Sequence, residues 1–198
     1  MWIFFLNQKS KACATFKKFK SLVEKERGYE IKALRSDRGG EFTSKEFNHF
    51  CATNGIRRPM IVPGSPQQNG MADRKNRIIL NMARSMLKEK HMPKEFWAEA
   101  VSCAVYLTNR SPTLNVRNRT PQEAWNGRKP NVSHSRVFGS ITYVHVPNQE
   151  RLKLDDQSVK HVFVGYEYHS KGYRLFNPTN SKVVVSCNVE FDEEGMWN

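Results

Sequence analysis

The chain has 198 residues, enough for one large domain or two small ones, and 38% of them are hydrophobic, so a core can form. Its 32 Lys and Arg against 19 Asp and Glu give a net charge of +13, which indicates a polyanionic partner such as nucleic acid; a basic protein without such a partner is the alternative. MWIFFL is too short for a signal-peptide core and no apolar run approaches a membrane span, so we expect no membrane contact and a nuclear or cytoplasmic protein.

The positive charge is concentrated in the first half of the chain. Residues 1–90 hold 19 Lys and Arg against 8 Asp and Glu (+11), whereas residues 91–198 hold 13 against 11 (+2). Because of this excess of positive charge, a nucleic-acid contact is expected in the first half.

The four cysteines, at 13, 51, 103 and 187, form no C-x-x-C pair, which argues against a zinc ribbon or a disulfide framework and fits a reducing compartment.

Hydrophobic spacing and turn residues predict alternating strands and helices over the first 127 residues. Ser44 and Gly55 are expected to cap one of these helices. The first strand begins almost at Met1, which predicts that a part of the domain lies upstream. The expected elements are strand 2–6, helix 10–28, strand 29–37, helix 44–55, strand 57–63, helix 71–90, helix 93–111 and helix 120–127.

From residue 128 the amino-acid composition changes. Gly, Pro, Asn and Ser form a linker, and four strand-like runs follow at 137–146, 160–167, 172–177 and 181–193, which predict a small antiparallel barrel or sandwich. The expected domains are thus an α/β domain over 1–127, a linker over 128–135 and an all-β domain over 136–195.

Two aspartates mark a candidate site in the α/β half. Asp37 ends a predicted strand, where chemistry gathers in α/β folds, and Asp73 lies in the first turn of helix 71–90. Both side chains can face one crevice. The alternative for Asp73 is simple stabilisation by the positive end of the helix dipole.

Three motifs carry a family resemblance. The stretches LRSDRGGEFTSKEF (34–47), NGIRRPMIVPGSPQQNGMADRKNR (54–77) and PKEFWAEAVSCAVYLTNRSP (93–112) resemble the integrase of copia-type retrotransposons, within the retroviral integrase superfamily. The tail, from FGSITYVHVP to VVVSCNVEFDE, resembles the SH3-like barrel that follows integrase in those Pol polyproteins. The resemblance implies a ribonuclease H-like core with a mixed sheet and flanking helices, truncated at its N-terminus, and then an SH3-like barrel.

The resemblance also implies a metal-dependent polynucleotidyl transferase. In that family three carboxylates hold two Mg²⁺ or Mn²⁺ ions, and 35 residues separate Asp37 from Asp73, as in the aspartate-35-glutamate signature. Asp37 matches the second carboxylate, and Asp73 stands where the family has glutamate. The first aspartate is absent because the chain starts too late. We therefore expect a catalytically defective fragment with weakened metal binding.

The loop and helix around Asp73 hold the expected DNA contacts. Gln67, Gln68 and Asn69 offer amides to phosphates or bases, and Arg74, Lys75 and Arg77 offer positive charge at a helix N-terminus. The alternatives are an ordinary Pro/Gly turn and a solvated charged face with an Asp73–Arg77 pair. The Tyr residues of 143–173 either stack on bases or fill the core.

The family resemblance implies DNA, both element ends and target, as the partner, with homo-oligomerisation and no small-molecule substrate. Two other functions stay open. One is an active integrase or recombinase whose upstream part was lost in gene prediction. The other is a domesticated protein-interaction module in which the basic half is incidental.

Overall fold

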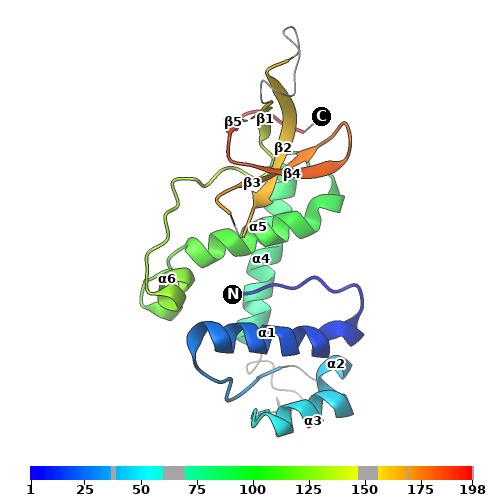
Figure 1. Cartoon of the computed structure of the whole chain (residues 1–198), viewed down its shortest axis with the longest axis vertical. Coiled ribbons are helices and arrows are strands. Elements are labelled where there is room, and N and C mark those ends of the chain that lie inside the picture. The colour runs from blue at the N-terminus through cyan, green and yellow to red at the C-terminus, as the bar shows by residue number, and fades with distance from the viewer. Residues whose placement is uncertain (37–38, 60–69, 147–155, 169, 198) are drawn as a thin grey trace. The chain divides into compact units, whose positions relative to one another are not determined.

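The computed structural model describes residues 1–36, 39–59, 70–146, 156–168 and 170–197. The chain divides into two compact units, residues 4–76 and residues 1–3 with 77–198, and each is described by itself. Helix α4 crosses the division (Figure 1). The domain boundaries expected from sequence, 1–127, 128–135 and 136–195, stay a prediction.

The smaller unit is built from helices around a phenylalanine cluster. Phe16 packs against Phe47 and Phe50, with ring centroids 5.4 and 6.4 Å apart, and Phe47 is fully buried beside Cys51. Ser44 caps its helix as expected, since its side chain accepts a hydrogen bond from the Phe47 amide. The helices are η1 (Lys9–Lys11), α1 (Ala12–Arg27), α2 (Gly40–Thr43) and α3 (Lys45–Thr53).

Two strands expected in this half do not form. Residues 2–6 have no strand structure, and their side chains Trp2, Phe4, Phe5 and Leu6 are 40–48% exposed. Residues 29–36 contribute only a single parallel bridge, between Ala33 and Arg57. A strand needs a neighbouring strand to pair with its N–H and C=O groups. Among the described residues of the smaller unit, this bridge is the only β pairing.

The larger unit holds three longer helices and an antiparallel sheet. The helices predicted at 71–90, 93–111 and 120–127 are confirmed. Pro121 at the start of the last one and Gly127 in a left-handed conformation after it supply the start and stop signals. The helical elements are α4 (Gly70–Glu89), η3 (Lys94–Phe96), α5 (Trp97–Arg110), η4 (Leu114–Val116) and α6 (Pro121–Asn126).

The sheet has five strands in the order β4-β3-β2-β1-β5, all antiparallel. The last predicted run, 181–193, is two strands and not one, because the chain turns at 187–188 between a strand paired with β3 and a strand paired with β1. The edge strand β4 exposes Val183, Val184 and Val185 by 37–50%. The strands are β1 (Ile141–His145), β2 (Ser158–Tyr166), β3 (Tyr173–Asn177), β4 (Lys182–Ser186) and β5 (Val189–Asp192).

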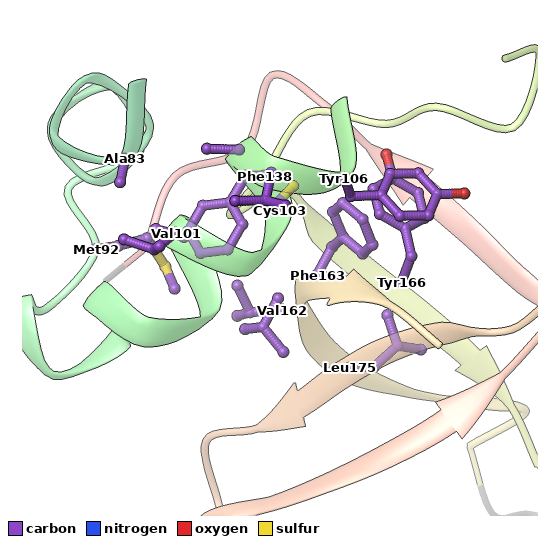
Figure 2. Close-up of a cluster of buried hydrophobic side chains, with 14 of the residues drawn as sticks. Ala83, Met92, Val101, Cys103, Tyr106, Phe138, Val162, Phe163, Tyr166 and Leu175 are labelled. Carbon is purple, nitrogen blue, oxygen red and sulfur yellow. The ribbon is translucent and has the colours of Figure 1, made fainter. Parts of the chain in front are cut away.

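Helix α5 covers one face of this sheet (Figure 1). Figure 2 shows Val101 and Cys103 of α5 in one cluster with Val162 and Phe163 of β2, and all four are at most 4% exposed. Burying this apolar surface between helix and sheet is what holds the unit together. Among the described residues, no helix is long and apolar enough to cross a membrane.

Candidate nucleic-acid interface

Helix α4 presents basic side chains because its apolar residues fix which side faces the core. Ile79 and Ala83 are 5% and 4% exposed, and Met82 and Met86 are packed against the same core. These residues form an apolar stripe on the core side of the helix, whereas Ile78 is 41% exposed. Charged residues on the rest of the helix, Arg84 and Lys88 among them, are exposed.

The predicted site residues that the structure describes lie at the start of α4. Asp73 lies in the first turn and is exposed, as are Arg74 and Arg77, while Lys75 is half-buried. None of the described carboxylates lies within 4.0 Å of the charged nitrogens of Arg74, Lys75 or Arg77. Within the described part of the chain, the ion pairs that form do not include these three cations, and the alternative of a solvated charged face stays open.

The other predicted site residues lie outside the described part of the chain. These are Asp37, Gln67, Gln68 and Asn69. Whether the side chains of Asp37 and Asp73 converge stays a prediction. Among the described residues, no group of three or more His, Cys, Asp or Glu side chains is arranged to hold a metal ion.

Basic residues elsewhere in the smaller unit are partly neutralised. The ammonium of Lys17 lies 2.8 Å from Glu46, and that of Lys20 lies 2.7 Å from Glu24. These hydrogen bonds lower the pKa of both carboxyl groups and raise the pKa of Lys17. Two cations of the KKFK stretch (17–20) of α1 are thus engaged in ion pairs.

One polar cluster was missed by sequence reasoning. The guanidinium of Arg110 lies 3.3 Å from the ring centroid of Tyr106, and the Tyr106 hydroxyl lies 2.6 Å from Nε2 of His134. The spacing of Tyr106 and Arg110, one turn apart on α5, was the signal available in the sequence.

The comparisons with known proteins cover almost the whole chain. A family model, the retroviral polymerase SH3-like domain, matches residues 140–198. The retrovirus-related Pol polyprotein from transposon TNT 1-94 of Nicotiana tabacum is 45% identical over 98% of this chain and 14% of its own length. The chain corresponds to a segment of a retrovirus-related Pol polyprotein.

Related Pol polyproteins give the same result. The polyprotein from transposon RE2 of Arabidopsis thaliana is 35% identical over 97% of this chain and 13% of its own length. This Pol segment thus spans about one seventh of the length of the curated relatives that it matches. The match at 140–198 confirms that the antiparallel sheet belongs to an SH3-like domain.

Solved structures with some likeness to the Pol segment are retroviral integrases. A simian T-cell lymphotropic virus intasome in complex with PP2A regulatory subunit B56 gamma aligns over 94% of this chain and 65% of that chain, with 16% identity and a TM-score of 0.49. The trimeric HTLV-2 integrase catalytic core domain in complex with magnesium aligns over 59% and 68%, with 22% identity and a TM-score of 0.43. Both scores are below 0.5, too low to bear on function.

Proposed function

We propose that this Pol segment binds DNA through the start of α4, as a part of the DNA integration pathway. The observation that carries the proposal is the 45% identity to a retrotransposon Pol polyprotein over 98% of the chain. The exposed Arg74 and Arg77, with half-buried Lys75, lie where the positive end of the helix dipole also favours phosphate. Residues 1–90, which include them, carry a net charge of +11.

Gln67, Gln68 and Asn69 are proposed to contact the same DNA. They directly precede α4 in the sequence, and their amide groups can donate to phosphate oxygens and accept from bases. DNA ends and target DNA as substrates, and assembly into homo-oligomers, are part of this proposal by resemblance to integrases.

Asp37 and Asp73 are proposed as ligands of Mg²⁺ or Mn²⁺. Carboxylate oxygens suit these cations, and a bound pair of such ions supplies an activated nucleophile and a stabilised leaving oxygen for phosphodiester chemistry. Asp73 reaches one carbon–carbon bond, ~1.5 Å, less far than the family glutamate. Since a displacement of about 1 Å can cost roughly 100-fold in rate, we propose that the chain is catalytically defective.

DNA binding is tested by salt titration of a fluorescent duplex with the full chain. Replacing Arg74, Lys75 and Arg77 together by Ala should weaken binding and reduce the slope of log K against log salt by about 2 to 3, at roughly 0.9 for each phosphate that the protein no longer neutralises. The control carries the same charge change at exposed Arg128, Lys129 and Lys182. Equal slopes in the two triple variants would show that total charge alone acts, and would overturn the interface at α4.

The metal proposal has a readout besides activity. Mn²⁺ binding, followed by electron paramagnetic resonance, should weaken in Asp37→Asn and strengthen in Asp73→Glu. Strand transfer by the unaltered chain should not exceed that of Asp37→Asn. Activity that Asp37→Asn abolishes would overturn the catalytic defect and favour a working recombinase, and Mn²⁺ affinity equal in all three proteins would remove both aspartates from the metal site.

A further inference from the structure

A pocket of about 400 Å³ opens in the larger unit, beside the SH3-like sheet. Its described lining comes from the end of α5, from Asn131, Ser133 and His134, and from residues 166–168 and 170–173. The volume falls in the range of about 300–1,000 Å³ that is typical of ligand sites. The question is which hydrogen-bonding groups in it remain available to a ligand.

The tyrosine hydroxyls in the wall are already paired. The Tyr106 hydroxyl shares a hydrogen bond with His134, that of Tyr166 accepts from the Arg136 amide at 2.9 Å, and that of Tyr173 donates to the His134 carbonyl at 3.0 Å. Figure 2 shows the rings of Tyr106 and Tyr166 side by side. They stack with centroids 4.0 Å apart and planes 13° apart. These side chains build a rigid wall, and their hydroxyls are engaged within the protein.

The guanidinium of Arg110 has N–H donors that the described protein groups do not use. This group lies over the Tyr106 ring and makes one hydrogen bond within the described part of the chain, to the Tyr106 carbonyl at 3.3 Å, although it carries five N–H donors. It is half-buried, and none of the described carboxylates lies within 4.0 Å of it. Burial lowers the pKa of Arg110. A partly desolvated cation without a counter-charge indicates an anionic partner.

The rest of the lining adds a second cation and a free aromatic face. Lys171 is exposed at the pocket, and the one carboxylate among the described lining residues, Glu167, accepts a hydrogen bond from the Tyr168 amide at 2.9 Å. Tyr168 is 67% exposed. Two cations beside an exposed aromatic ring match a ligand that joins a phosphate to a flat ring.

We propose that this pocket holds one nucleotide of a single-stranded nucleic acid, with its phosphate on Arg110 and Lys171 and its base stacked on Tyr168. Stacking on an exposed tyrosine is tolerant of base identity, and the cations track the backbone. A phosphotyrosine peptide could use the same cations, but the exposed position of Tyr168 favours the base of a strand that continues past the pocket. The site shares no residue with the group proposed at the start of α4.

The test uses the full chain and a fluorescein-labelled oligo(dT) strand in an anisotropy titration. Tyr168→Ala should raise Kd roughly 5- to 150-fold, whereas Tyr168→Phe keeps the stacking face and should stay within about twofold. Arg110→Gln should weaken binding and reduce the salt slope by about 0.7, the value for one contact on a single strand, while Arg110→Lys should retain that slope. Tyr143→Ala, at a β1 tyrosine that is 40% exposed and outside the pocket lining, is the matched control.

The outcomes separate this site from the duplex site on α4. The triple Ala variant of Arg74, Lys75 and Arg77 should leave the Tyr168→Ala effect on oligo(dT) intact, so either proposal can fail alone. Equal affinity of Tyr168→Ala and the unaltered chain would overturn the nucleotide pocket. A phosphotyrosine peptide that binds through Arg110 while oligo(dT) binding ignores both residues would also overturn it. If Arg110→Gln does not fold, the comparison of Tyr168→Ala with Tyr168→Phe, at an exposed position, still tests the proposal.

Discussion

The ammonium of Lys90 donates a hydrogen bond to the backbone carbonyl of Gly195 at 3.0 Å, and it donates a second to the carbonyl of Glu193. Lys90 is 5% exposed and follows directly after α4. The Trp197 amide returns a hydrogen bond to the Lys90 carbonyl at 3.3 Å. A buried lysine thus fastens the last residues of the chain to the end of α4.

Lys90→Met should therefore destabilise the larger unit by about 1–3 kcal/mol, since charge-assisted hydrogen bonds are removed while the apolar stem is kept. Urea unfolding followed by tryptophan fluorescence measures it, because Trp197 lies in the released segment. Lys88→Met, at an exposed position on the same helix, should change the free energy of unfolding by less than about 0.5 kcal/mol. Equal losses of stability in the two variants would show that the fastening contributes nothing.

Gly139 is constrained by the same lysine. Its φ is +81°, and a Cβ at this position would lie 2.7 Å from Cβ of Lys90. Gly139→Ala should cost about 2–4 kcal/mol, from backbone strain and overpacking together. Gly127→Ala, at φ +75° with no atom within 4 Å of the added Cβ, has the strain alone and should cost about 1–2 kcal/mol. Thermal unfolding of the two variants isolates the effect of overpacking, and equal shifts in Tm would contradict it.

The substitutions Thr142→Val and Thr120→Val are expected to change stability in opposite directions. The Thr142 hydroxyl is fully buried and has no hydrogen-bond partner among the described residues, so Thr142→Val should leave stability unchanged or raise it by up to about 1 kcal/mol. The Thr120 hydroxyl accepts from the Glu123 amide at 3.0 Å as the N-cap of α6, so Thr120→Val should cost about 1–2 kcal/mol. Chemical unfolding of both variants checks the opposite signs. A clear drop in stability in Thr142→Val would mean that its hydroxyl is satisfied.

Stability should fall at alkaline pH through Cys103. Burial raises the pKa of this thiol from 9.0 to about 12, and the residue is 1% exposed. Because the folded pKa lies above the unfolded one, the stabilisation is complete below pH 9 and is lost as the pH rises towards 12, by about 1.4 kcal/mol per pH unit.

The measurement is the free energy of urea unfolding between pH 9 and 11 under reducing conditions. Across this range Cys103→Ala should lose about 2 kcal/mol less than the unaltered chain. Cys187→Ala, at an exposed cysteine, should follow the unaltered chain. Parallel curves for Cys103→Ala and the unaltered chain would reject the buried thiol as the cause.

Helix spacing allowed much of the fold to be predicted. The apolar residues of α4 and α5 recur at helical intervals, and caps such as Ser44 and Pro121 depend on local chemistry alone. Residues 2–6 show the limit of this reasoning, because a strand exists only where a partner strand lies beside it. The run 181–193 failed for a related reason: its two halves pair at opposite edges of the sheet, which composition does not reveal.

The sites were predictable to different degrees. Asp73 and its basic neighbours stand out in sequence because they lie together at one helix start, and the structure places them on α4. The tyrosines of 143–173 were predicted to be either stacking or core residues: Tyr166 is buried in the core, whereas Tyr168 is exposed, and its stacking on a base stays a prediction. His134 joins Tyr106 and Arg110 through tertiary packing of a distant segment, which no local pattern encodes.

The uncovered edge of β4 has a consequence for handling the protein. Within the described residues the strand pairs with β3 on one side only, and its three valines are 37–50% exposed. Such an edge can pair with a strand of another chain and so extend the sheet. Lys182 is the one charged residue of β4 that opposes this association. Concentrated samples should therefore gel or precipitate through strand addition before the fold itself gives way.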